Sequence, residues 1–175
     1  AQGTEETPAA PSAVRKENLV VALQAEPQTI DPYAASHDTT FISSEAIFEP
    51  LFKYEDGELT PWLATAYEMV DDLTLKLTLR DDVLFHDGNK MTADDVVFSL
   101  CYGATSNFTS TLFGAIDTEN TKALDEQTVE VKLLYPYAPL LEAMASHRCA
   151  IVSKAAYESM DADAFGRAPV GTGPM

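Results

Sequence analysis

The sequence predicts an α/β fold in which a small mixed or antiparallel sheet is flanked by helices. Residues from Leu73 to Arg80 alternate strictly between leucine and a polar residue, which is the pattern of a strand with one buried face. Shortly afterwards, Thr92 and Asp95 have the spacing of a capping box, and apolar residues then recur at helical spacing. A strand and a capped helix therefore share one stretch, Leu59 to Leu100, which is the centre of the predicted fold.

Length and charge limit the classes of protein to which the chain can belong. A chain of 175 residues can bury one substantial core, and we expect one domain with a second, incomplete piece. It carries 11 basic and 28 acidic side chains, and 11 − 28 gives a net charge of −17 at pH 7 with histidine neutral. Such a surface repels phosphate backbones, so we expect no nucleic-acid partner. No apolar run approaches the length of a membrane span.

The first third of the chain predicts a tether, a strand, a loop and a helix. Residues 1–17 lack aromatic side chains and are rich in Pro, Ala, Thr and Glu, so we expect a disordered tether. An apolar strand is predicted at 19–23, and the two prolines within 26–33 predict a loop. A helix follows from about residue 41 to 48, and an extended run at 51–54 turns at Asp56-Gly57.

The central stretch predicts a hairpin and the capped helix. Residues 66–70 pair with 73–80 through a tight turn at Asp71-Asp72. The group at 86–89, His-Asp-Gly-Asn, has the composition of a turn, which explains His86-Asp87 without a metal or acid–base role. The helix begins after Thr92 and is expected to stop at Gly103. Its predicted buried stripe consists of Ala93, Val97, Leu100, Cys101 and Ala104.

The remaining elements are predicted from alternation, turn residues and prolines. We expect a loop with a short helical piece over 102–116, then a hairpin of 121–124 with 128–134. A short helix is predicted at 140–145, a strand at 150–152 and a helix at 153–160. The four aromatic residues in loops can either line a pocket or close the edge of the core: Tyr33, Phe41, Phe108 and Phe113.

The cysteines and histidines show no metal-site or redox spacing. Cys101 and Cys149 match neither a zinc pattern nor a CxxC motif, so we expect two small core residues, with a disulfide left open as the alternative. His147 beside Arg148 is expected to offset a helix dipole at a helix end. The sequence has no nucleophile elbow, phosphate loop or zinc-protease motif. We therefore expect no enzyme activity, no catalytic residue, no metal and no cofactor.

Several separate motifs, in a fixed order, resemble those of the family 5 extracellular solute-binding proteins, the peptide- and nickel-type receptors of ABC importers. They are Ile30-Asp31-Pro32, the FEPLFKY text at 48–54, the 59–100 stretch, the Pro-x-Ala-Pro-Leu-Leu text at 136–141 and PVGTGP at 169–174. The resemblance implies a fragment of a lobe of the periplasmic-binding-protein type II kind, ahead of an absent second lobe. It divides the chain into the tether at 1–17, the first strand, loop and helix of the main lobe at 18–50, a small α/β subdomain at 51–168 and a return segment at 169–175.

The resemblance also implies a function and a site. We expect a monomeric receptor that captures di- or oligopeptides and delivers them to a membrane permease, either in the periplasm or lipid-anchored on the outer face of the cell membrane. The alternatives are a nickel complex, haem, a sugar oligomer or a signalling peptide as the ligand, and, in a different class, a hydrolytic enzyme. For His37-Asp38, ligand contact and plain loop both stay open. The residues that match cleft-facing positions are Ser36, His37, Thr39, Thr40, Phe108, Thr109, Gly171 and Thr172.

Overall fold

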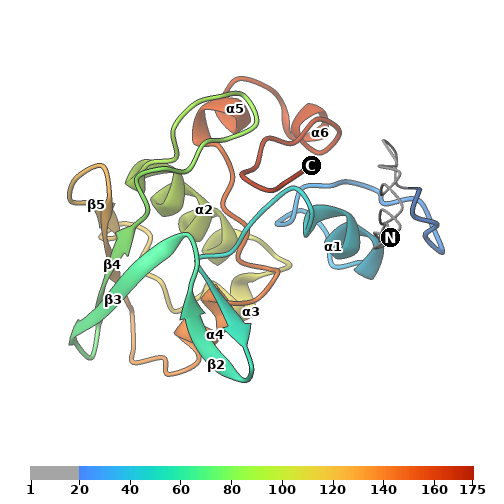
Figure 1. The fold of residues 1–175 in the computed structure, drawn as a ribbon. Helices are drawn as coiled ribbons and strands as arrows, with labels where there is room; N and C mark the ends of the chain where they lie inside the picture. The colour runs from blue at the N-terminus through green and yellow to red at the C-terminus, as the bar shows by residue number, and fades with distance from the viewer. Residues whose placement is uncertain (1–19) are drawn as a thin grey trace, which may run out of the picture.

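The computed structural model describes residues 20–175 and contains two antiparallel sheets (Figure 1). The smaller sheet is the hairpin of β1 (Phe52–Glu55) and β2 (Glu58–Pro61). Asp56 and Gly57 connect its strands with φ angles of 53° and 86°, the left-handed conformation that two-residue hairpin turns require. The predicted extended run and its turn at Asp56-Gly57 are therefore confirmed. The tether predicted at 1–17 lies outside the described residues.

The larger sheet has the order β3-β4-β6-β5 and holds the predicted hairpins. β3 (Ala64–Asp71) pairs with β4 (Thr74–Leu79), and β6 (Thr128–Lys132) pairs with both β4 and β5 (Lys122–Ala123). The leucines of β4 and the valines of β6 are fully buried, as the alternation predicts. The buried faces of β4 and β6 thus pack into one core, and each such aliphatic side chain contributes about 1.5–3 kcal/mol. Leu73 is an exception, because it lies in the turn before β4 and is 40% exposed.

Helix α2 (Ala93–Thr105) covers the buried face of this sheet and starts at the predicted capping box. The predicted stripe was partly wrong. Val96, Leu100 and Gly103 are buried, whereas Val97, Cys101 and Ala104 are half-buried. Gly103 does not end the helix, which continues to Thr105. A Cβ atom at Gly103 would lie 2.9 Å from the ring of Tyr33, so glycine is needed there for close packing.

Two strands predicted from short apolar runs do not form. Residues 20–23 lie outside both sheets, with Val20 and Val21 largely exposed, because no described strand runs beside them. Residues 150–152 are buried and extended but bond to other segments: Ile151 N–H donates to the Glu49 carbonyl over 3.1 Å. A strand needs a continuous neighbour, and a local apolar pattern carries no information about one.

The other helices are short. α1 spans Asp38–Ser44, earlier than the predicted helix at 41–48, because its first turn consists of the polar residues that follow His37. The predicted helical piece and C-terminal helices are found as α3 (Ser110–Phe113), α4 (Leu140–Met144) and α5 (Lys154–Glu158). α6 (Ala162–Phe165), capped by Asp161, was not predicted. None of the described helices has both the length and the apolar character that crossing a membrane requires.

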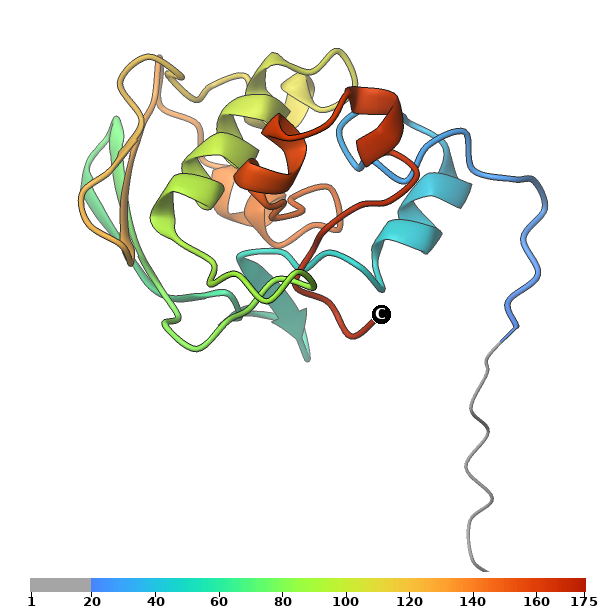
Figure 2. The ribbon, with the colours of Figure 1, turned by 90° about the horizontal axis from the view of Figure 1, so that it is seen from above.

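The elements form layers, which Figure 2 shows from above. The four-stranded sheet lies at one side, α2 lies against it, and α5 and α6 lie on the far side of α2, with α1 beyond them. A second, smaller core joins these outer helices to the segment after residue 30. It contains Tyr33, Phe48, Ala150, Val152, Ala156 and Phe165.

The segment 170–175, which we call the strap, has no regular structure and crosses this second core. Its amides bond to the turn that follows α1, with Gly173 N–H donating to the Ile47 carbonyl over 2.8 Å. Val170 accepts a hydrogen bond from Ser153 N–H over 3.3 Å, so the strap also joins the start of α5. The predicted division into main lobe, subdomain and return segment stays a prediction.

Candidate functional site

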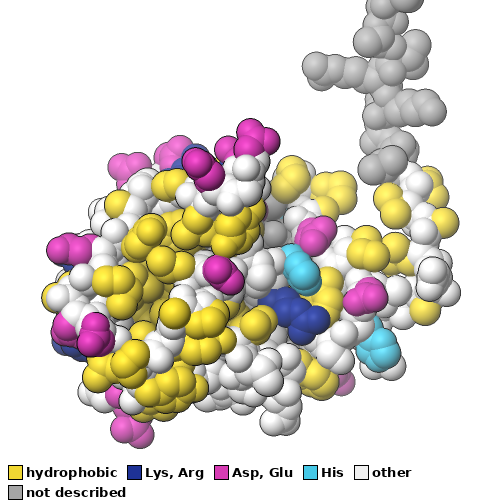
Figure 3. All heavy atoms as spheres, turned by 90° about the horizontal axis from the view of Figure 1, so that it is seen from below, with side chains coloured by type: hydrophobic (Ala, Val, Ile, Leu, Met, Phe, Trp, Pro, Cys, Tyr) yellow, Lys and Arg dark blue, Asp and Glu magenta, His cyan; other side chains and the backbone are white. Residues whose placement is uncertain are grey.

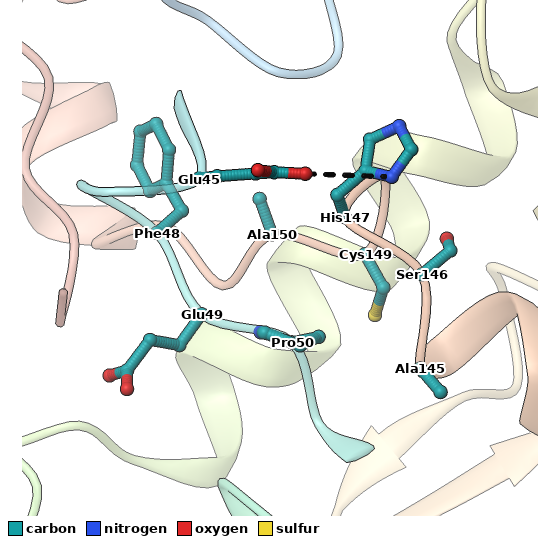
Figure 4. Close-up of a pocket in the computed structure, with 9 residues that line it drawn as sticks. All are labelled: Glu45, Phe48, Glu49, Pro50, Ala145, Ser146, His147, Cys149 and Ala150. Carbon is teal, nitrogen blue, oxygen red and sulfur yellow. Dashed lines mark ion pairs between the residues drawn. The ribbon is translucent and has the colours of Figure 1, made fainter. Parts of the chain in front are cut away.

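A cleft of about 420 Å³ lies between the segment that follows α1 and the segment that follows α4 (Figure 4). Its walls come from 45–50 on one side and 145–150 on the other, two segments about a hundred residues apart in the chain. Neither segment is a helix or a strand. Pro50, which lacks a backbone N–H, ends the first segment, and the second contains a turn that starts at Ser146. The lining residues are Glu45, Phe48, Glu49, Pro50, Ala145, Ser146, His147, Cys149 and Ala150.

The two carboxylates of the cleft point in different directions. Figure 4 shows Glu45 pointing toward His147, and the Glu45 Oε1 and His147 Nδ1 atoms lie 3.9 Å apart. The Glu49 carboxylate points away from this pair in the same view. It is held there because Trp62 Nε1–H donates to Glu49 Oε1 over 2.9 Å. Lys53 Nζ lies 3.7 Å from the centroid of the Trp62 ring and pairs with Glu55.

Glu45 and His147, which line the cleft, and the adjoining residues Phe41 and Arg148 form what we call the rim cluster. The Phe41 ring is buried and packs edge-on against the His147 imidazole, with 5.1 Å between centroids. The Arg148 guanidinium carbon lies 4.3 Å from the centroid of the Phe41 ring. The aromatic ring therefore supports both an imidazole and a guanidinium beside a carboxylate. On the face seen in Figure 3, a Lys or Arg side chain lies next to a His side chain near the middle.

Helix α1 connects His37 to two members of this cluster. His37 is the N-cap, its carbonyl accepts from Phe41 N–H, and Phe41 in turn accepts from Glu45 N–H. Phe41 and Glu45 are four residues apart, and both meet His147, whereas His37 is the extended residue that precedes the helix. The His37 side chain itself is exposed and forms no capping bond.

Arg148 is half-buried and forms no ion pair with a carboxylate of residues 20–175. By contrast, Arg80 and Lys53 are paired with neighbouring carboxylates. A guanidinium offers a planar fork of N–H donors that fits a carboxylate. The rim cluster can therefore bind an anionic group at Arg148.

The second core holds this side of the cleft in place. Tyr33 O–H donates to the Ala150 carbonyl over 2.6 Å, and Tyr102 O–H donates to Asp31 Oδ2 over 2.8 Å. Burial raises the pKa of Asp31 above its ordinary value, against the lowering effect of hydrogen bonds from Tyr33 N–H and Tyr102. Burial is also the main reason that the pKa values of Tyr33 and Tyr102 are raised, so both hydroxyls stay protonated donors.

Two predicted site residues are committed to internal hydrogen bonds. Thr40 is fully buried, and its hydroxyl donates to the Thr29 carbonyl over 2.9 Å. Thr109 is equally buried, and its hydroxyl donates to the Gly103 carbonyl over 2.8 Å. These two hydroxyls therefore hold loops to helices.

The other predicted site residues lie in three separate places. Ser36 and His37 are exposed and Thr39 is half-buried at the start of α1. Phe108 is 43% exposed in the connection between α2 and α3. Gly171 and Thr172 belong to the strap, where Gly171 is buried. Of these, His37 is the one that directly precedes α1, the helix that carries Phe41, and ligand contact by the set stays a prediction.

The alternatives left open for the aromatic residues and cysteines have separate outcomes. Tyr33 and Phe113 are core residues, whereas Phe41 carries the rim cluster. Both cysteines are free, and Cys149 is fully buried, as predicted for a core residue. Cys101 is only half-buried, because it lies at the side of the α2 stripe. Among the described residues, no three metal-ligating side chains gather at one point.

Neither Arg148 nor Glu45 was predicted as a candidate site residue. The signal that could have found Arg148 is its position in a turn, next to a histidine, in a chain with few basic residues. Glu45 carried no such signal, because its role depends on a segment about a hundred residues away.

The comparison with protein families matches residues 58–174 to the model described as "Bacterial extracellular solute-binding proteins, family 5 Middle". Among curated proteins, the glutathione-binding protein GsiB of Escherichia coli O6:K15:H31 is 30% identical over 165 residues, which are 93% of this chain and 32% of that protein. The chain thus spans about a third of the length of the curated relatives that it matches.

Two solved structures share this fold over most of the chain. The structure of NikZ from Campylobacter jejuni in complex with Ni(L-His) matches with a TM-score of 0.73 and 29% identity, over 87% of this chain and 31% of that one. DppA from Helicobacter pylori, a periplasmic binding protein in complex with the peptide STSA, matches with a TM-score of 0.72 and 25% identity, over 86% of this chain and 34% of that one.

Proposed function

Because the chain belongs to the bacterial extracellular solute-binding proteins of family 5, we propose that it forms part of a receptor that captures a peptide for an ABC importer. Its fold is that of part of a type II periplasmic binding protein, as predicted. The receptor works outside the cytoplasm and delivers its solute to a membrane permease. Its relatives are described as binding proteins.

The observation that carries this proposal is Arg148 at the rim of the cleft. Its guanidinium rests on the Phe41 ring and has no carboxylate partner among the described residues. Resting on the ring limits the rotamers of the side chain, so less conformational entropy is lost when a ligand binds. In our proposal Arg148 binds the carboxylate of the solute, and the cleft beside it holds the neighbouring atoms.

The ligands of the relatives support this choice of chemistry. Glutathione, L-histidine in its nickel complex and the peptide STSA are all built from amino acids and carry a carboxylate. Glu45, on the other side of the rim cluster, supplies a negative charge that suits the ammonium group of such a solute.

The proposal is tested by calorimetry on the full-length protein with a short peptide such as STSA, its C-terminal amide and glutathione. We expect the free peptide acid to bind at least about tenfold more tightly than the amide, since a hydrogen bond to a charged group contributes about 1.5–3 kcal/mol. Equal affinities for acid and amide would contradict the role of Arg148. No binding of any of the three would contradict the peptide class.

A nickel complex is the second candidate ligand. It is favoured by the similarity to NikZ and by His147, which lines the cleft. Calorimetry with nickel and L-histidine, together and separately, distinguishes the two classes. Binding only of the mixture, with no response to peptides, would select the nickel complex.

A further inference from the structure

His86 lies in a rigid turn on the side of the fold where the strap passes. Phe85 N–H donates to the Asn89 carbonyl over 2.8 Å, and Gly88 adopts a φ of 84° that favours glycine. Asp87 accepts hydrogen bonds from the backbone and side-chain amides of Asn89. The turn is therefore braced internally, and the His86 backbone has a fixed position.

His86 makes three polar contacts with the strap. Its backbone N–H donates to the Gly171 carbonyl over 3.0 Å. Its Nδ1 lies 3.4 Å from the Gly171 backbone nitrogen, which donates to it, and its Nε2 lies 2.8 Å from the Gly173 carbonyl oxygen. A carbonyl only accepts and an N–H only donates, so the neutral ring with its proton on Nε2 is the one state that satisfies both side-chain contacts.

The strap touches the wall of the cleft at the same two glycines. A Cβ atom at Gly171 would overlap the Ile47 carbonyl and lie 2.7 Å from the Phe48 ring, and Phe48 lines the cleft. Gly173 N–H donates to the Ile47 carbonyl. His86 therefore bonds to Gly171 and Gly173, the two strap residues that pack against Ile47 and Phe48.

We propose that His86 is a positioning residue for the solute cleft, a clasp whose Nε2–H tautomer fixes the strap behind Ile47 and Phe48. The inference rests on the proposed function for the cleft itself. Protonation at Nδ1 removes the acceptor for Gly171 N–H and leaves the Gly173 contact, so the strap loosens at the residue that packs against Phe48. Thr172 favours such loosening, since its buried hydroxyl has no hydrogen-bond partner among the described residues.

Few charged groups compete for His86. On its own turn Asp87 is occupied by Asn89, and Lys90 follows as the first residue after the turn. The strap, residues 170–175, and the neighbouring residues 46–48 contain no titratable side chain. A change in the protonation state of His86 therefore acts mainly on its hydrogen bonds with the Gly171 N–H and the Gly173 carbonyl.

The test begins without solute, by NMR on the protein labelled with ¹⁵N. We expect the neutral His86 ring to carry its proton on Nε2, and the exchange rate of the Gly171 amide to rise, beyond its intrinsic pH dependence, as His86 becomes protonated. An Nδ1–H tautomer, or Gly171 exchange that does not follow the titration of His86, would overturn the clasp. Neither readout depends on solute binding, so the clasp and the proposed function can fail separately.

The second part of the test compares His86→Gln with His86→Ala in peptide binding. Glutamine can both donate and accept, so His86→Gln is expected to keep the affinity at pH 7.5, whereas His86→Ala is expected to lose about three- to tenfold. Between pH 7.5 and pH 5.5, the peptide affinity of the wild type should fall more than that of His86→Gln. Because His37 and His147 are present in all three proteins, the difference between wild type and His86→Gln isolates His86. Parallel pH profiles for those two would overturn the proposal.

Discussion

Asp95 near the start of α2 accepts a hydrogen bond from the backbone N–H of Lys154 at the start of α5, over 3.0 Å and 59 residues of chain. Its other carboxylate oxygen, Oδ2, accepts from the backbone and the hydroxyl of Thr92, 2.9 Å and 2.8 Å away. One buried carboxylate therefore caps a helix and joins the two cores. The capping was predicted from the spacing of Thr92 and Asp95, but the bond to Lys154 was not.

Asp95→Ala is expected to lower the free energy of unfolding by about 2–4 kcal/mol, since it removes a cap and leaves buried donors without a partner. Asp94→Ala is the matched control. Asp94 is exposed on the same turn, and we expect a change below about 0.5 kcal/mol there. Urea unfolding monitored by circular dichroism measures both. Similar values for the two variants would mean that the bonds of Asp95 contribute little.

Asp31 gives the stability a definite pH dependence. Because burial raises the pKa of Asp31 above its ordinary value of 3.8, the folded state holds this proton more tightly than the unfolded state. Its contribution therefore favours folding at acid pH and is lost as the pH rises from about 3.8 through the raised value. Asp31→Asn lacks this dependence. The unfolding free energy of wild type minus that of Asp31→Asn should thus decrease with rising pH, and a difference that stays constant would refute the shift.

The two thiols should differ in reactivity. Burial raises the pKa of Cys149 to about 12, and burial also raises that of the half-buried Cys101. In a native chain at pH 8, Ellman's reagent is expected to titrate Cys101 slowly and Cys149 more slowly still, while both react at once in urea. Rapid reaction of Cys149 in the folded protein would show that its site opens readily.

His37→Ala is expected to change peptide affinity without lowering the melting temperature. The side chain is exposed and makes no capping bond, so its loss should not affect the fold, yet it directly precedes α1, the helix that carries Phe41. Calorimetry and a thermal melt on the full-length protein check both parts. An unchanged affinity would return His37 to the plain loop that was left open as the alternative.

The sheet, α2 and the turns could be predicted because their causes are local. The alternation at 73–80, the Thr92–Asp95 spacing and Asp56-Gly57 each determine backbone geometry within a few residues. Residues 20–23 and 150–152, within the two other predicted strands, form no strand for the opposite reason. A short apolar run forms a strand only if another segment supplies a strand beside it. Ile151 is buried, but its backbone N–H bonds to the Glu49 carbonyl and to no strand.

The site was less predictable because it is assembled from distant segments. The predicted contacts in the loop after residue 33 stay a prediction, and His37 precedes the helix that carries Phe41. Thr40 and Thr109 look like ligand contacts in the sequence, yet both hydroxyls bond to nearby carbonyls. Arg148 became a candidate binding residue only when the fold placed it over Phe41.

Binding of a peptide acid and its amide to wild type, Arg148→Ala and Arg167→Ala tests the central claim most directly. Arg167 is an exposed arginine outside the cleft, just after α6, and serves as the matched control. We predict that Arg148→Ala binds the acid about 10- to 100-fold more weakly than wild type and no longer distinguishes it from the amide, while Arg167→Ala behaves as wild type. If Arg148→Ala still prefers the acid as strongly as wild type does, the solute carboxylate does not bind at the rim cluster.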